Sequence, residues 1–146
     1  MRDYIRFDIV KFLKDSRHWD GQIADLLAEM ESITEIGGVG TGMPSGGDIS
    51  RPVERTAVRK DAIRQQIDKI QEYKECFRYV WTHAEEDDLI ILKGFYYAPG
   101  YIYEFVEWWC DAFASNREYC YRAKREAETR FAEACLDWMV SQGYDV

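Results

Sequence analysis

The sequence predicts an all-α protein. Two long stretches in its first half place apolar residues three and four positions apart, which is the spacing of one face of a helix. No segment of the 146 residues alternates apolar and polar side chains convincingly with the period of two that a half-buried strand requires. The expected architecture is a long antiparallel, coiled-coil-like helical hairpin followed by a small C-terminal helix-turn-helix bundle.

The first expected element is a long N-terminal helix within residues 1–36. Its apolar positions advance by alternating fours and threes through four heptads, with Ser16 as the one polar position. Charged residues of both signs lie between them, as on the solvated face of a helix. The seam consists of Ile5, Ile9, Phe12, Ser16, Trp19, Ile23, Leu26, Met30 and Ile33.

A glycine-rich segment, residues 37–50, follows this helix. It contains six glycines in fourteen residues and therefore predicts a flexible loop. It differs from phosphate-binding loops because it lacks Lys and Arg and follows a helix rather than a strand.

The second helix of the hairpin is expected over residues 51–82. Pro52 is tolerated in a first helical turn, and the apolar residues after it again lie three and four apart. Because two helices alone do not cover both of their apolar stripes, we expect the chain to form a homodimer.

Residues 83–146 are expected to form the C-terminal bundle. Thr82 and Glu85 have the spacing of a capping box, and the acids at 85–88 suit the positive end of a helix dipole. Pro99 and Gly100 should end the first short helix. Three helices, the last of them basic at its start, outline a helix-turn-helix. The expected ranges are 89–97, 102–113 and 117–140.

The last helix begins in the stretch SNREYCYRAKREAETRF, residues 115–131, which carries a charge of +2 in a chain of net charge −8. Counting 100° per residue separates an apolar inner face from an outer face that carries arginines. Outward arginines near a helix start suit the major groove of DNA. The inner face is Cys120, Ala123, Ala127, Phe131, Ala134 and Trp138; the outer face is Glu118, Tyr121, Arg122 and Arg125, flanked by Arg117 and Lys124.

Five pieces occur in order along the chain: a charged N-terminal helix, then GMPSGG, SRPVERTAVRKDAI, LIILKGFYY and NREYCYRAKREA. Together they resemble the phage-encoded ArpU/RinA-type transcription regulators, whose C-terminal part is similar to the promoter-reading region four of sigma factors. The resemblance implies a DNA-binding regulator of late phage genes, with double-stranded DNA and RNA polymerase as partners.

The resemblance also implies roles for single residues. Asn116 takes the helix-capping position, Tyr121 and Arg122 match the tyrosine and arginine of the pattern, and Ala127 matches its small packing residue. The segment 107–115, which includes a Trp108–Trp109 pair, is about three residues longer than the family's usual helix-turn and lacks its glycine. The expected DNA-binding residues are Asn116, Arg117, Tyr121, Arg122, Lys124 and Arg125.

Other classes of function find little support. Four cysteines and two histidines lack the spacing of a zinc site, and neither HExxH nor GxSxG occurs. We therefore expect no metal, cofactor, small-molecule substrate or enzymatic activity. No apolar run approaches the roughly 20 residues of a membrane span, and the charged start does not resemble a signal peptide, so a cytoplasmic location is expected. The alternative is an acidic phage protein-binding module, or an inhibitor of a host nucleic-acid-processing enzyme, that does not bind DNA; the charge of −6 over residues 81–112 favours this alternative.

Overall fold

The computed structural model describes the backbone of residues 8–39 and 50–143, and the side chains of 8–33 and 55–143. In these ranges the chain is helical and contains no strand, which confirms the all-α prediction. The chain divides into two compact units. Unit 1 comprises Met1–Arg17 and Glu75–Val146, and unit 2 comprises His18–Lys74.

The predicted single N-terminal helix is wrong. Helix α2, Ile9–Ser16, ends before helix α3, Trp19–Val39, begins. The Ser16 hydroxyl donates to the Leu13 carbonyl and lies 2.5 Å from the Tyr97 hydroxyl, and Arg17 donates to the Tyr96 carbonyl. These side-chain bonds favour a helix end at this point. The predicted portion before residue 8 lies outside the described residues.

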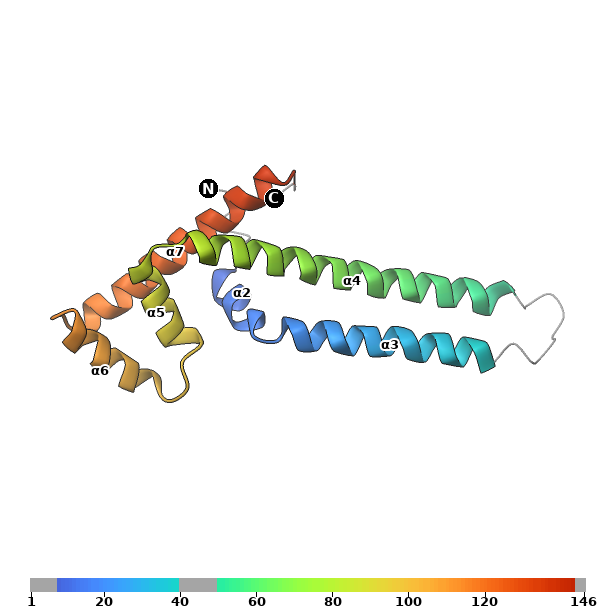
Figure 1. Ribbon diagram of the computed structural model, residues 1–146, viewed down its shortest axis with the longest axis horizontal. Coiled ribbons are helices and arrows are strands. Elements are labelled where there is room, and N and C mark those ends of the chain that lie inside the picture. The colour runs from blue at the N-terminus through green and yellow to red at the C-terminus, as the bar shows by residue number, and fades with distance from the viewer. Residues whose placement is uncertain (1–7, 40–49, 144–146) are drawn as a thin grey trace. The chain divides into compact units, whose positions relative to one another are not determined.

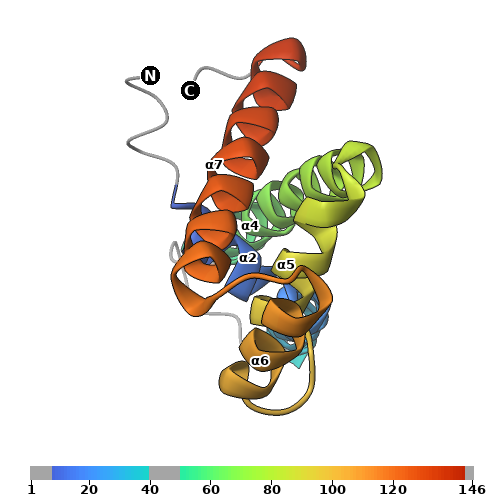
Figure 2. The ribbon, with the colours of Figure 1, turned by 90° about the vertical axis from the view of Figure 1, so that its left-hand side faces the viewer.

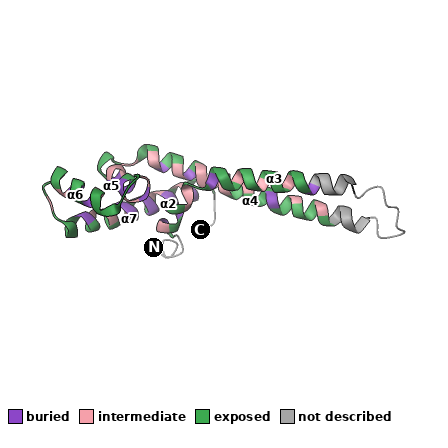
Figure 3. Cartoon of the chain, turned by 90° about the horizontal axis from the view of Figure 1, so that it is seen from below, coloured by how far each residue is buried: buried purple, intermediate pink, exposed green. Residues whose placement is uncertain are grey.

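Unit 2 contains α3 and the first part of α4, Ser50–His83. The two helices run side by side in opposite directions (Figure 1), with the Trp19 ring 6.1 Å from that of Tyr73. Buried and half-buried positions recur along both helices, with exposed residues between them (Figure 3). Full burial is limited, among the described side chains of this unit, to Trp19, Ile33 and Ile63.

The predicted glycine-rich loop is shorter than expected at its start, because α3 continues to Val39. The remaining residues of that prediction, 40–49, lie outside the described residues. Helix α4 begins at Ser50, one residue before the predicted start, and is continuous to His83.

Unit 1 is built around helix α7, Arg117–Ser141. This helix packs against α2, against α5, Glu86–Tyr96, and against α6, Ile102–Ala112 (Figure 2). Aromatic rings fill the space between the elements. The centroid of the Phe77 ring lies 5.8 Å from that of Phe131 and 6.3 Å from that of Phe12. The predicted boundary at residue 83 is therefore wrong, since α2 and the end of α4 belong to the same core as α7.

Helices α5 and α6 approach closely at Gly94. A Cβ atom added there would lie 2.0 Å from the Phe105 ring, so the packing has room only for glycine. The ring of Phe105 also meets Phe95 edge to face, at 5.4 Å between centroids. This contact fixes the position of α6 against α5.

The predicted capping box at the start of α5 is wrong. Thr82 belongs to the last turn of α4, where its hydroxyl donates to the Arg78 carbonyl, and Glu85 occupies the N-cap without a side-chain bond. The acids do begin a helix as expected, because Glu86, Asp87 and Asp88 form its first turn. No helix in the described part of the chain is both long enough and apolar enough to cross a membrane.

Candidate nucleic-acid interface

A short turn joins α6 to α7. Helix α6 ends at Ala112 and α7 begins at Arg117, so only residues 113–116 connect them. The Ser115 amide donates to the Cys110 carbonyl at 2.9 Å, and the Ala114 amide donates to the Asp111 carbonyl at 3.4 Å. This pair of bonds is the Schellman pattern of a helix C-terminus. Segment 107–115 is longer than the family's usual helix-turn. Its residues 107–112 belong to α6, so the additional length lies in the helix and not in the turn.

The Schellman turn requires a left-handed backbone at its second residue, and Ala114 supplies it with φ of 48°. Glycine is the usual residue there, because a Cβ atom costs roughly 1–2 kcal/mol in this conformation. The turn forms although the glycine is missing.

Asn116 caps α7, as the resemblance implies. Its side-chain oxygen accepts a hydrogen bond from the Tyr119 amide at 3.0 Å, and its backbone is extended. Glu118 lies in the first turn, where a carboxylate is stabilised by the helix dipole. The predicted start of the helix is thus confirmed.

The predicted inner face of α7 is confirmed at its centre and shifts along its length. Cys120, Ala127 and Phe131 are buried, whereas Ala123, Ala134 and Trp138 are half-buried. Further buried residues, which were not predicted from the sequence, advance by threes and fours on a slightly rotated stripe. They are Glu128, Ala132, Cys135 and Met139.

Five of the six predicted DNA-binding residues are exposed at the start of α7: Asn116, Arg117, Tyr121, Arg122 and Arg125. The Arg122 guanidinium lies 5.2 Å from the centre of the Tyr119 ring, and the Tyr121 ring lies 5.5 Å from that of Phe95. None of the three arginines makes an ion pair with a residue in the described ranges. Their charges are therefore available to a ligand.

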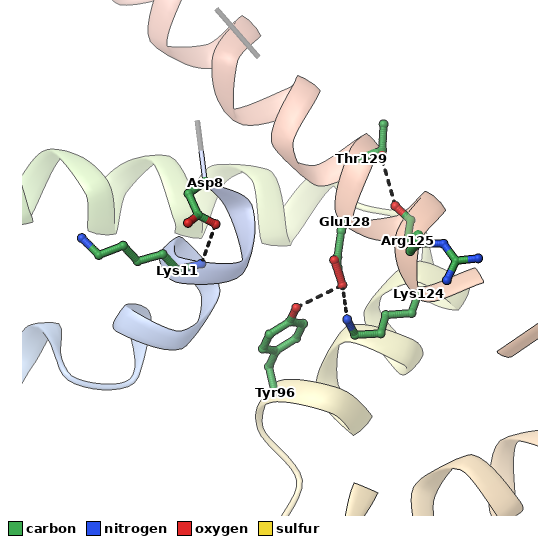
Figure 4. A network of polar contacts seen from close by, with 7 residues as sticks. All are labelled: Asp8, Lys11, Tyr96, Lys124, Arg125, Glu128 and Thr129. Carbon is green, nitrogen blue, oxygen red and sulfur yellow. Dashed lines mark hydrogen bonds and ion pairs between the residues drawn. The ribbon is translucent and has the colours of Figure 1, made fainter. Parts of the chain in front are cut away.

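Lys124 differs from the other predicted site residues because its ammonium group is already bound. It forms an ion pair of 2.6 Å with Glu128, and the Tyr96 hydroxyl donates to the same carboxylate oxygen at 3.0 Å (Figure 4). The ammonium also lies 5.3 Å from the centre of the Phe95 ring. Lys124 thus neutralises a buried carboxylate.

A second ion pair that the sequence reasoning missed joins α5 to α7. Arg130 donates two hydrogen bonds to the Asp88 carboxylate, of 2.6 and 2.8 Å. These bonds raise the pKa of Arg130 and keep it protonated. No signal in the sequence marks this contact, because the partners are 42 positions apart.

The tryptophan pair in α6 divides between core and surface. Trp109 is buried with Val106, whereas Trp108 is 54% exposed. Of the four cysteines, Cys110 in this helix is half-buried, and Cys76, Cys120 and Cys135 are buried. Burial raises the pKa of the Cys120 thiol, and a hydrogen bond with Cys76 raises that of Cys135.

We expect Ala114→Gly to raise the free energy of unfolding by up to about 1 kcal/mol, because it removes the strain of a left-handed alanine. Ala112→Gly, in the last turn of α6, is the matched control and should lower it by roughly 0.5–1 kcal/mol. Urea denaturation followed by circular dichroism measures both. A loss of stability in Ala114→Gly would contradict the role assigned to the turn.

The folded protein should lose stability above about pH 10 in a way that depends on Tyr96. Burial and the adjacent Glu128 carboxylate raise the pKa of this phenol above its ordinary value of 10.0. The unfolded phenol then loses its proton first, so stability present below pH 10 falls as the pH rises. The free energy of unfolding should fall less steeply with rising pH in Tyr96→Phe than in the exposed control Tyr119→Phe. Urea denaturation at several alkaline pH values measures both. Equal slopes would contradict this prediction.

No family model, curated protein or solved structure matches this chain. The resemblance to phage regulators therefore rests on the sequence pieces alone, and the functional conclusion depends on the geometry of α6, the turn and α7.

Proposed function

We propose that this protein is a non-enzymatic, DNA-binding transcription regulator that contacts duplex DNA through the start of α7. One observation carries the proposal: Arg117, Arg122 and Arg125 are exposed within the first turns of a helix that follows another helix through a four-residue turn. Turns of three to four residues are usual in DNA-binding helix-turn-helix motifs.

The chemistry of the exposed side chains suits a groove. A guanidinium group donates two hydrogen bonds to the edge of guanine or neutralises a phosphate, and the Tyr121 hydroxyl can donate to a phosphate oxygen. Glu118 is also exposed on this part of the helix, where its carboxylate can accept from the amino group of cytosine. Lys124 contributes through its support of Glu128 rather than through a direct contact.

The similarity to ArpU/RinA-type regulators supports a promoter region of late phage genes as the DNA target, with RNA polymerase as a further partner. In that family the corresponding helices are similar to sigma-factor region four. The exposed Arg122 and Tyr121, which match the family pattern, are the residues that connect this resemblance to the geometry.

We expect Arg122→Ala combined with Arg125→Ala to weaken binding to promoter fragments from the gene's own neighbourhood by at least about tenfold, because two guanidinium contacts are lost. Each lost phosphate contact should also reduce the slope of log affinity against log salt by about 0.9. Fluorescence anisotropy of labelled duplexes over a salt series measures both quantities.

The matched control is Lys11→Ala combined with Arg78→Ala, which removes the same charge from two exposed positions of unit 1 outside α7. It should leave both affinity and slope close to those of the unchanged protein. A protein that binds none of these fragments at low salt would contradict the proposed function, and so would equal losses in the two double variants.

We also propose that unit 2 forms a homodimer. Five apolar residues of its two seams remain half-exposed, although the helices lie side by side. A second copy that presents the same stripes would bury them in a four-helix arrangement. These residues are Ile23, Leu26, Met30, Ile67 and Ile70.

Analytical ultracentrifugation should give a mass twice the 17.2 kDa of one chain. Leu26→Glu should shift it to the mass of one chain, because a carboxylate would be placed in the apolar seam. Leu27→Glu, at the adjacent and exposed position, is the control and should remain dimeric. A mass of one chain for the unchanged protein at every concentration would contradict the dimer.

A further inference from the structure

The outward side of α6 combines an exposed tryptophan with three carboxylates. Trp108 is 54% exposed, and Glu104, Glu107 and Asp111 are exposed around it. Tyr101, which precedes the helix, is 69% exposed. We call these five residues the α6 face.

Helical spacing places these residues on one side. Glu104 and Asp111 lie four positions before and three positions after Trp108, and offsets of three and four share a helix face. Glu107 lies three positions after Glu104 and four before Asp111, so it borders the same face. Val106 and Trp109 are buried on the opposite side and hold the helix against the rest of unit 1. The α6 face is therefore presented to solvent by a fixed helix.

Among the described residues, the three carboxylates of the α6 face are not ion-paired, and the basic residue next to them is Arg117, at the start of α7. Residues 101–116 contain no Lys, Arg or His, and none of the three carboxylates forms an ion pair within the described part of the chain. The described residues also contain no group of three side chains that could hold a metal ion. Because no ion pair from the described ranges occupies these carboxylates, they can pair with a cation from outside the chain.

A hollow of about 420 Å³ continues from this face toward the start of α7. Two of the acidic residues, Glu107 and Asp111, line it together with the half-buried Cys110. The hollow offers space for a long side chain with a positive end. Its lining is Val106, Glu107, Cys110, Asp111, Asn116 and Arg117.

We infer that the α6 face binds a Lys- or Arg-bearing segment of a partner protein. A cation over the face of Trp108 gains a cation–π contact while the flanking carboxylates pair with it, and the aromatic surface covers the aliphatic stem. Exposed aromatic residues are enriched at protein interfaces. Nucleic acid does not fit the same surface, because phosphates repel the three carboxylates.

This inference does not depend on the proposed DNA binding. The α6 face uses acids and aromatic rings of α6, whereas the proposed DNA contacts use arginines of α7. The two surfaces meet at the hollow, where Arg117 lies beside Glu107 and Asp111. A chain that binds both would connect a basic protein segment to DNA. Loss of peptide binding at the α6 face and loss of DNA binding at α7 can be measured independently.

The test is a display selection of random peptides of about 16 residues, which are long enough for four helical turns, against the full-length protein. Peptides that bind are measured by fluorescence anisotropy against the unchanged protein and against the variant Glu104→Gln, Glu107→Gln, Asp111→Asn. The 5-fluorotryptophan signal of Trp108, identified by its absence in Trp108→Phe, reports whether the peptide reaches the α6 face.

We expect the selected peptides to be enriched in Lys and Arg, to shift the Trp108 signal, and to bind the triple variant at least about tenfold more weakly. The control variant Glu126→Gln, Glu133→Gln, Asp137→Asn removes the same charge from exposed positions of α7 and should bind as the unchanged protein does. DNA binding by the triple variant should be retained, which separates this inference from the proposed function.

Three results would overturn the inference. One is a selection that yields no binding peptide, and another is one whose peptides are acidic or carry no excess of Lys and Arg. The third is equal weakening by the triple variant and its control, since the effect would then reflect net charge alone. Circular dichroism of both triple variants confirms that a loss of binding does not come from a loss of helix.

Discussion

The rotation of α7 about its own axis is the constraint on which the surfaces of unit 1 depend. Glu128 is buried on the inner side of this helix, and a buried carboxylate is tolerated only with partners. Lys124, one turn earlier, and Tyr96, from α5, both reach the same oxygen. Because Tyr96 belongs to α5, its bond to Glu128 turns this side of α7 toward α5, and Arg122 and Arg125 lie on the solvent side.

The sequence predicted helices α5, α6 and α7 of unit 1 well, because their limits depend on local chemistry. Pro99 and Gly100 separate α5 from α6, and Asn116 caps α7 at the expected residue. The break after Ser16 could not be predicted, since the apolar heptads continue across it. The hydrogen bonds that stabilise it are made with Tyr96 and Tyr97, about 80 positions away along the chain. Contacts between segments far apart in sequence leave no periodic signal.

The candidate site was predicted in part for the same reason. Counting along α7 located Arg122 and Arg125 on the exposed side, but it could not show that α5 would bury Glu128 and place the Phe95 ring beside Lys124. The left-handed Ala114 was also beyond prediction, because the sequence shows only that glycine is absent. Helix α6 ends at Ala112, one residue before the predicted end, and a four-residue turn leads to α7.

The burial of the cysteines has a consequence for chemical labelling. Thiolates, rather than thiols, react with alkylating reagents, and both burial and a raised pKa disfavour the thiolate. Cys76, Cys120 and Cys135 are buried, and the pKa values of the last two are raised, whereas Cys110 is half-buried at the wall of the hollow. A maleimide dye added to the native chain would therefore react first at Cys110, so the unmodified sequence already carries a position for an optical probe between α6 and α7.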